Sequence, residues 1–222
     1  MKTQPVSARI VFDLDGTLID SAPDIHAIAN EVLALEGAKP ITLADTRRFV
    51  GNGAAVFVAR MRRARGLSDA AQERMYNAFV ARYDRAVGRT HPYPGVVDAL
   101  TRLRASGHRL GVCTNKPLGP ARAVLAHLQL DGFFDVVIGG DSLRVKKPDP
   151  APLEAAFEAL GAGPMIYVGD SEVDAETALR IDVPFLLYTE GYRKTGVEQI
   201  SKSALFSEFR DLSRLVKAVL PG

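Results

Sequence analysis

Aspartates closely follow two short apolar runs of this sequence, where they could do chemistry together. Asp13 and Asp15 follow residues 8–12 (ARIVF), and Asp170 follows closely on residues 165–168 (MIYV). Carboxylates held within a few ångströms repel one another unless a cation or protons relieve their charge. No histidine or cysteine is placed with them, so the donor atoms are hard oxygens, which favour Mg²⁺ over zinc or copper. Such an aspartate can also act as a nucleophile and form an aspartyl phosphate.

Polar side chains suited to a phosphoryl group follow two further apolar runs. Thr114 and Asn115 come directly after residues 109–113, and Lys147 lies beyond residues 135–138. A hydroxyl and an ammonium can hold phosphoryl oxygens, and phosphoryl transfer depends above all on positioning and charge neutralisation. The pattern therefore indicates phosphoryl transfer.

The residues after Asp13 offer two more groups to this chemistry. Asp15 can protonate the leaving oxygen and later activate water. The turn at Gly16 can aim backbone N–H groups at the phosphoryl oxygens. One short segment thus supplies a nucleophile, an acid and an anion-binding turn.

The elements that must position these groups follow from the apolar pattern. Five short runs, bounded by Gly, Pro or charge, are typical of strands: 8–12, 109–113, 135–138, 165–168 and 183–188. They are continuous rather than alternating, which predicts parallel strands buried on both faces. Helical patterns separate them at 94–106, 119–130, 151–160, 173–180 and 208–220. We therefore expect an α/β fold with a doubly wound, Rossmann-like parallel sheet, whose carboxyl edge gathers the polar groups.

Residues 21–92 interrupt this alternation, and we call them the helical insert. We find no strand in them and expect helices at 22–35, 43–49, 54–64 and 70–87. The expected domains are an α/β core, residues 1–20 and 93–222, and an α-helical cap domain, residues 21–92. Residues 22–92 carry 11 Lys and Arg against 7 Asp and Glu. Two interpretations of this excess are open: an uneven distribution of surface charge, or a basic lid that attracts an anionic substrate.

Composition excludes several classes of protein. The net charge of +2 is too balanced for a strong nucleic-acid expectation. No run approaches the roughly 18 apolar residues that a membrane span needs. Residues 1–7 lack the layout of a signal peptide, and the single cysteine, Cys113, excludes a disulfide within the chain. We expect a cytoplasmic protein without nucleic-acid or membrane partners, as a monomer or a homodimer.

The chain resembles the haloacid dehalogenase superfamily over essentially its whole length. Four motifs in the expected order carry the resemblance: Asp13-Leu14-Asp15-Gly16-Thr17-Leu18, Thr114-Asn115, Lys147-Pro148 and Gly169-Asp170-Ser171-x-x-Asp174. The helical insert matches the cap that this superfamily carries between its first and second motifs. Within the superfamily the chain is similar to the phosphoglycolate phosphatases. Glu172-Val173 departs from the pattern, because many relatives carry an Asn beside the last Asp.

The resemblance implies specific roles. Asp13 would attack phosphorus and Asp15 would act as acid and base, in an Mg²⁺-dependent hydrolysis of a small anionic phosphate ester such as 2-phosphoglycolate. The implied metal ligands are Asp13, the Asp15 carbonyl and Asp170, with Asp174 supporting the metal directly or through water. The implied phosphate-binding residues are Gly16, Thr17, Thr114, Asn115 and Lys147. The implied specificity loop of the cap is Gly51, Asn52 and Gly53.

Other interpretations stay open at this point. A phosphatase of sugar phosphates or pyrophosphate, a β-phosphoglucomutase or a 2-haloacid dehalogenase would share much of this pattern, and a non-enzymatic binding module could use the same scaffold. Asp170 and Asp174 could merely favour a helix N-terminus, and Gly51 to Gly53 could be a plain turn. Arg47 or Arg48 could meet a carboxylate of the substrate.

Overall fold

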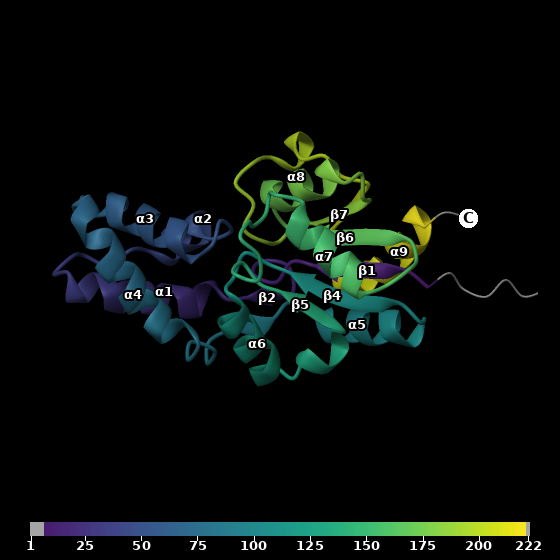
Figure 1. Cartoon of the computed structure of the whole chain (residues 1–222), viewed down its shortest axis with the longest axis horizontal. Helices are drawn as coiled ribbons and strands as arrows, with labels where there is room; N and C mark the ends of the chain where they lie inside the picture. Colours follow the sequence, from purple (N-terminus) through teal and green to yellow (C-terminus); the bar gives the residue numbers. More distant parts are fainter. Residues whose placement is uncertain (1–6, 221–222) are drawn as a thin grey trace, which may run out of the picture.

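A six-stranded parallel sheet forms the centre of the molecule, and its strand order is β5-β4-β1-β6-β7-β8. The computed structural model describes residues 7–220 (Figure 1). The strands are β1 (Arg9–Phe12), β4 (Arg109–Cys113), β5 (Val136–Ile138), β6 (Met165–Gly169), β7 (Phe185–Tyr188) and β8 (Ala204–Phe206). Phe12 at the end of β1 is in register with Val112 of β4 and Val168 of β6. The ends of these three strands therefore lie side by side.

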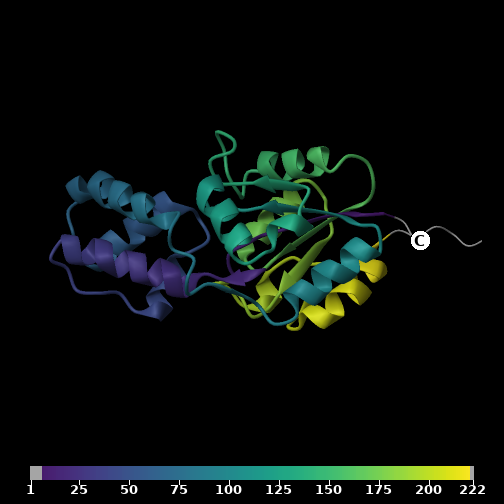
Figure 2. The same cartoon turned by 90° about the horizontal axis from the view of Figure 1, so that it is seen from below.

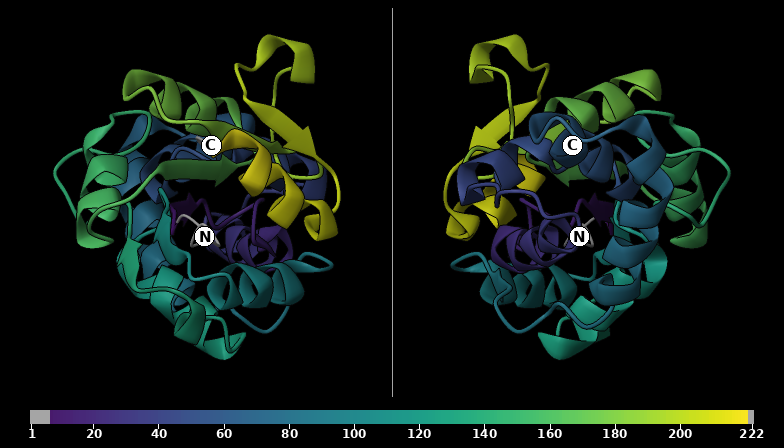
Figure 3. Two further views of the ribbon diagram at one scale, coloured as in Figure 1. Left: turned by 90° about the vertical axis from the view of Figure 1, so that its right-hand side faces the viewer. Right: turned by 90° about the vertical axis from the view of Figure 1, so that its left-hand side faces the viewer.

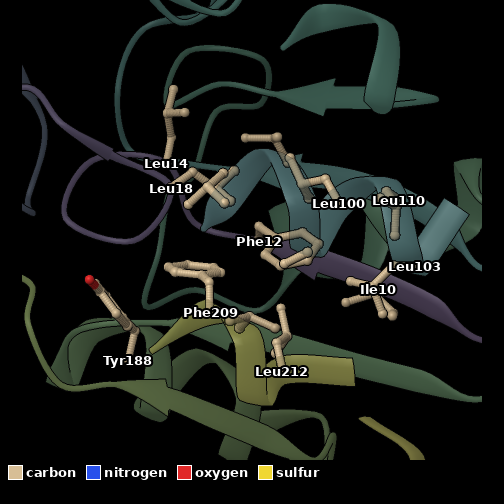
Figure 4. Close-up of a cluster of buried hydrophobic side chains, with 14 of the residues drawn as sticks. Ile10, Phe12, Leu14, Leu18, Leu100, Leu103, Leu110, Tyr188, Phe209 and Leu212 are labelled. Atoms are coloured by element: carbon tan, nitrogen blue, oxygen red, sulfur yellow. The ribbon is translucent and has the colours of Figure 1, made fainter. Parts of the chain in front are cut away.

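Helices cover both faces of the sheet, as expected for a doubly wound α/β fold (Figure 2). One face packs against α5 (Val96–Ala105), α6 (Leu118–His127) and α9 (Leu212–Val219), and the other against α7 (Ala151–Ala159) and α8 (Glu172–Arg180). Because neighbouring side chains of a strand point to opposite faces, Ile10 and Phe12 join the first layer (Figure 4) and Val11 joins the second. The predicted fold class is confirmed.

The helical insert packs into a body of its own at one end of the sheet (Figures 1 and 2), and it lies in front of the sheet when the molecule is viewed from that end (Figure 3, right). Its helices are α1 (Ala22–Leu35), α2 (Leu43–Phe49), α3 (Ala54–Ala64) and α4 (Gln72–Tyr83). They bury a common apolar core that includes Phe57, Met61 and Phe79. Three of the four helices have the boundaries that the sequence predicts.

A short antiparallel ribbon joins the helical insert to the sheet. It consists of β2 (Ile19–Asp20) and β3 (His91–Pro92), in which Ile19 pairs with Pro92 and Asp20 with His91. The expectation that residues 21–92 contain no strand is therefore wrong at the end of the insert. Two residues are too few to give a periodic signal.

Other predictions differ at the edges of elements. The sixth strand, β8, was not expected, because three residues cannot show a strand pattern. The helix predicted at 70–87 is shorter, with a 3-10 turn at Asp69–Ala71 before α4. The helix predicted from residue 94 begins after Gly95, whose φ of 81° is left-handed.

Residues 1–6, on which the signal-peptide argument mostly depends, lie outside the described residues. Among the described helices, none is long and apolar enough to cross a membrane.

Candidate active site

Three buried carboxylates meet at the carboxyl edge of the sheet. Asp13 follows β1 and Asp170 follows β6, which are neighbouring strands, while Asp174 lies in the first turn of α8. Oxygen atoms of Asp13, Asp170 and Asp174 lie within 4.8 Å of one another. The structure thus brings together the side chains of three of the four predicted metal ligands. The fourth, Asp15, was predicted to bind through its backbone carbonyl and is not part of this group of side chains.

Asp170 is fixed by hydrogen bonds from two loops. Thr17 Oγ1 donates to Asp170 Oδ1 at 2.7 Å, and the backbone N–H of Tyr192 donates to Oδ2 at 2.6 Å. Gly16 packs directly against this carboxylate: its φ is 90°, and a Cβ there would lie 2.5 Å from Asp170 Oδ2. Thr17, which was predicted to bind phosphate, is fully buried, and its hydroxyl orients Asp170.

Asp174 has several partners and is inaccessible to solvent. Its Oδ2 accepts from the N–H and the hydroxyl of Ser171 at 3.1 and 2.6 Å, which forms a capping box at the start of α8. Its Oδ1 accepts from Lys147 Nζ at 2.7 Å and from the Tyr167 hydroxyl at 2.8 Å. Asp174 therefore both caps a helix and belongs to the acidic cluster.

Lys147 bridges two members of the cluster. Its Nζ lies 3.0 Å from Asp13 Oδ1 and 2.7 Å from Asp174 Oδ1. It also donates to the hydroxyl of Tyr167 at 2.7 Å. Tyr167 was not singled out from the sequence, because an aromatic residue inside a buried strand has the same pattern as an ordinary core residue.

The crowding is visible in the pKa values of the cluster. Burial and the neighbouring Asp174 raise the pKa of Asp13 to about 7, against the opposing effect of Lys147. Burial, with Asp174 and Asp13, raises the pKa of Asp170 well above its ordinary value. Burial also opposes ionisation of Asp174, but Lys147, Ser171 and Tyr167 hold its pKa below the ordinary value. The cluster thus carries more negative charge than one lysine compensates.

The donor atoms suit a hard cation. Asp13 Oδ1 is buried without a well-directed hydrogen bond, and Asp13 and Asp170 have raised pKa values. All the side-chain donors are carboxylate oxygens, the donor type that Mg²⁺ and Ca²⁺ prefer. An acidic cluster that fits a divalent cation is therefore present at the predicted place.

A small cavity of about 30 Å³ opens beside Asp13, between the sheet edge and the helical insert. Side chains from both parts form its walls. The sheet side contributes Asp13, Asp15, Thr114, Asn115 and Lys116, and the insert contributes Ile25, Val50, Gly51, Gly53, Ala54, Phe57, Phe79 and Tyr83. The predicted nucleophile, acid and hydroxyl thus line the same cavity.

Asp15 is held by a lysine that the sequence analysis did not assign to the site. Lys116 Nζ lies 3.2 Å from Asp15 Oδ1, and Ser21 Oγ donates to the same oxygen at 2.6 Å. Lys116 Nζ also lies 3.0 Å from the hydroxyl of Tyr83 in α4. A lysine in the segment Asn-Lys-Pro looks like an exposed loop residue, so only its pairing in three dimensions identifies it.

The predicted specificity loop reaches the cavity with its glycines. Gly51 and Gly53 have φ values of 111° and 85°, which side chains rarely adopt, and both line the cavity. The side chain of Asn52 instead accepts a hydrogen bond from Arg60 at 2.8 Å. Asn115 Nδ2 donates to the carbonyls of Gly51 and Lys147, both at 3.0 Å. Asn115 therefore ties this loop to the sheet edge in this arrangement.

The basic character of the helical insert is not directed at the cavity. Arg47 pairs with Asp20, Arg48 with Asp45, and Arg74 with Glu36. The part of the cavity wall that the insert contributes is apolar apart from Tyr83 and the loop backbone. The cation on the wall, Lys116, comes from the sheet side.

Comparison with known proteins agrees with this geometry. The family model for haloacid dehalogenase-like hydrolases matches residues 10–188. The chain belongs to this family.

Relatives in the haloacid dehalogenase-like family cover nearly the whole chain. A phosphoglycolate phosphatase of Cereibacter sphaeroides (strain ATCC 17029 / ATH 2.4.9) is 47% identical over 214 residues, which are 95% of this chain and 98% of the relative. A phosphoglycolate phosphatase of Rhodobacter capsulatus is 43% identical and covers 96% and 98%. The crystal structure of a Haemophilus somnus 129pt protein, described as a predicted phosphoglycolate phosphatase, has a TM-score of 0.89 at 28% identity and covers 97% and 100%.

Proposed function

We propose that this chain is a phosphatase that hydrolyses a small anionic phosphate ester, 2-phosphoglycolate, to glycolate and phosphate. The observation that supports this most is the convergence of Asp13, Asp15 and Thr114 on one cavity, beside Lys147 and the acidic cluster. The names of the relatives supply the substrate.

In the proposed reaction, Asp13 attacks phosphorus and Asp15 donates a proton to the leaving oxygen. The bond from phosphorus to the ester oxygen breaks, and glycolate leaves with that proton. Asp15 then takes a proton from a water molecule, which attacks phosphorus and releases phosphate from Asp13. Both carboxylates line the cavity, so one substrate can reach both.

The phosphoryl group would be held by side chains around Asp13. Thr114 lines the cavity with a buried hydroxyl, and Lys147 lies within ion-pair distance of Asp13. The ammonium of Lys147 offsets negative charge that develops on the phosphoryl oxygens. Asn115 is expected to contribute once its amide is released from the carbonyls that it binds here.

Mg²⁺ is the proposed cofactor. Asp13, the Asp15 carbonyl and Asp170 would hold it, with Asp174 in support. When bound, it supplies charge neutralisation to the carboxylates and to the phosphoryl oxygens. Thr17, Gly16 and the Tyr192 N–H keep Asp170 turned toward that place.

The helical insert is proposed to act as a cap, residues 21–92, over a core formed by the rest of the chain. Closing the cap excludes water and confines the substrate. Its contribution to the cavity is largely apolar, with Ile25, Phe57 and Phe79. A sugar hydroxyl left unpaired against such a wall costs about 1–3 kcal/mol. A short substrate without hydroxyl groups is therefore favoured over a sugar phosphate.

A kinetic comparison tests the function. Hydrolysis of an aryl phosphate and of 2-phosphoglycolate is measured with Mg²⁺ and with a chelator, for the wild type and Asp13→Asn. Asp13→Asn should lose activity by about 10⁴-fold or more, because it removes the nucleophile. Asp131→Asn, an exposed aspartate of the same core, is the control. Full activity of Asp13→Asn on both esters contradicts the proposed mechanism.

Assembly and compartment remain parts of the proposal. A monomer or a homodimer is expected, and sedimentation velocity distinguishes the two. A cytoplasmic location is consistent with the single cysteine, Cys113, which is buried and unpaired in the described chain.

A further inference from the structure

Lys116 is a buried cation that the proposed chemistry does not use. Its side chain is only 4% exposed. The ammonium lies 3.2 Å from Asp15 Oδ1, 3.0 Å from the Tyr83 hydroxyl and 4.2 Å from the centre of the Tyr83 ring. Lys116 and Asp15 therefore form a buried ion pair on the sheet side of the cavity. Asp15 is the one anionic side chain among the described ion-pair partners of this ammonium.

The position of Lys116 suits a group of the substrate. It lies on the wall of the cavity, and it is the one cationic side chain among the described residues of that wall. An ammonium has three N–H donors. The described partners account for two directions, toward Asp15 and toward Tyr83. Because both oxygens that it contacts on Asp15 belong to one carboxylate, at 3.2 and 3.5 Å, the ammonium can still serve an acceptor of a ligand in the cavity.

We propose that Lys116 binds the carboxylate of the phosphate ester and so determines the preference for a carboxylated substrate. This inference rests on the proposed function and names the residue behind its substrate choice. The first turn of α3, at Gly53 and Ala54, opens on the same cavity. The free N–H groups of a helix N-terminus add to the favourable potential for an anion.

The geometry also limits the length of the substrate. Asp15 must reach the leaving oxygen, and Lys116 is in direct contact with Asp15. A carboxylate held by Lys116 therefore lies a few ångströms from the leaving oxygen. A carboxylate attached one carbon away from the ester oxygen satisfies this requirement.

Other cations near the cavity have different partners. Lys194 Nζ donates to the carbonyl of Val50 at 2.8 Å. Arg60 holds the carbonyl of Phe49 and the side chain of Asn52, both at 2.8 Å. Lys146 is exposed and lies beside Gly53. Lys146 is thus the matched control, a lysine next to the same loop but outside the cavity wall.

The test compares 2-phosphoglycolate with its carboxamide, which has nearly the same shape and no second charge. The measured quantity is the ratio of kcat/KM for the two esters. The wild type should prefer the carboxylate by about 100-fold or more, and Lys116→Met should reduce this ratio by about 30-fold or more, because a desolvated charge pair is lost. Lys146→Met should leave the ratio within about threefold. Lys116→Gln, which keeps polar contacts but no charge, serves as a second variant should Lys116→Met fail to fold.

Three outcomes overturn the inference while the phosphatase assignment stands. If the wild type hydrolyses both esters equally well, the enzyme does not discriminate between a carboxylate and a carboxamide. An equal loss on both esters in the Lys116 variants means that Lys116 acts only through Asp15. If Lys146→Met lowers the ratio of kcat/KM as much as the Lys116 variants were expected to, the carboxylate binds near Lys146 rather than at Lys116. Absence of wild-type activity on any phosphate ester, by contrast, removes the proposed function itself.

Discussion

Lys147 Nζ and Asp174 Oδ1 lie 2.7 Å apart, and both side chains are almost completely buried. This pair connects the helix cap of α8 to the acidic cluster, because Asp174 also accepts from Ser171 and Lys147 also contacts Asp13. The helix cap and the acidic cluster therefore share one carboxylate.

Asp174→Asn should destabilise the protein by about 3 kcal/mol, because it leaves Lys147 with one anionic partner fewer in a buried place. Urea unfolding followed by circular dichroism measures this. Glu176→Gln is the control on the same helix, since Glu176 forms an exposed pair with Arg180 and should change stability by less than about 0.5 kcal/mol. Similar small effects of both substitutions would show that the buried pair contributes little.

Stability without metal should depend on pH in a specific direction. Asp13 has a pKa of about 7 in the fold and an ordinary value of 3.8, so the folded state binds more protons between these values. The free energy of unfolding in a chelator should therefore fall as pH rises from about 4 to about 7. The raised pKa of Asp170 acts in the same direction. The pKa of Asp174 is lowered in the fold, so this group changes the free energy of unfolding only at pH values below 3.8.

Mg²⁺ should reverse this loss, because a cation favours the ionised carboxylates. The increase in Tm on adding Mg²⁺ should be larger at about pH 8 than at about pH 5. Thermal unfolding at both values, in a chelator and in Mg²⁺, measures the difference. An increase that is as large under the acidic condition would contradict this account of the cluster.

Tyr192→Phe should loosen the connection between the sheet edge and the helical insert. The Tyr192 hydroxyl donates to Asp20 Oδ1 at 2.5 Å and accepts from the Ala22 N–H at 3.0 Å, while the backbone N–H that binds Asp170 is retained in the variant. We expect a loss of about 1–3 kcal/mol in stability. KM should rise about threefold or more and kcat should change little, because closure is affected rather than chemistry. A fall in kcat at constant KM would argue against this separation.

Gly16→Ala should disturb the acidic cluster. A Cβ at Gly16 would lie 2.5 Å from Asp170 Oδ2 and 2.9 Å from Tyr192 Cδ2. Gly37→Ala is the control, since Gly37 also has a positive φ but nothing lies within 4 Å of its Cβ position. Both variants should lose about 1 kcal/mol from backbone strain, and only Gly16→Ala should need much more Mg²⁺ for half-maximal activity. Identical Mg²⁺ titrations would exclude a clash at Asp170.

Much of the fold could be predicted from the sequence because its elements have strong local patterns. Residues 109–113 form a strand and residues 22–35, 43–49 and 54–64 form helices with the predicted boundaries. Elements of two or three residues, such as β3 and β8, were not predicted. Each depends on pairing with another strand, and so few residues carry no periodic signal.

Within the site, residue types were easier to predict than side-chain directions. The sequence places Asp13, Asp170 and Thr114 at one edge, since each follows a parallel strand. It does not reveal that Thr17 turns toward Asp170, or that Asn115 binds loop carbonyls. The direction in which a polar side chain points depends on which hydrogen-bond partners lie near it in the folded structure.

The pairing of β2 with β3 has a consequence for how this chain can change. Entry to and exit from the helical insert lie side by side, with Asp20 opposite His91. The four-helix segment is therefore attached to the sheet through two adjacent chain connections. If it were removed, a short turn could join the two ends that remain. A segment attached in this way can be replaced as a block, residues 21–90, without rethreading the sheet.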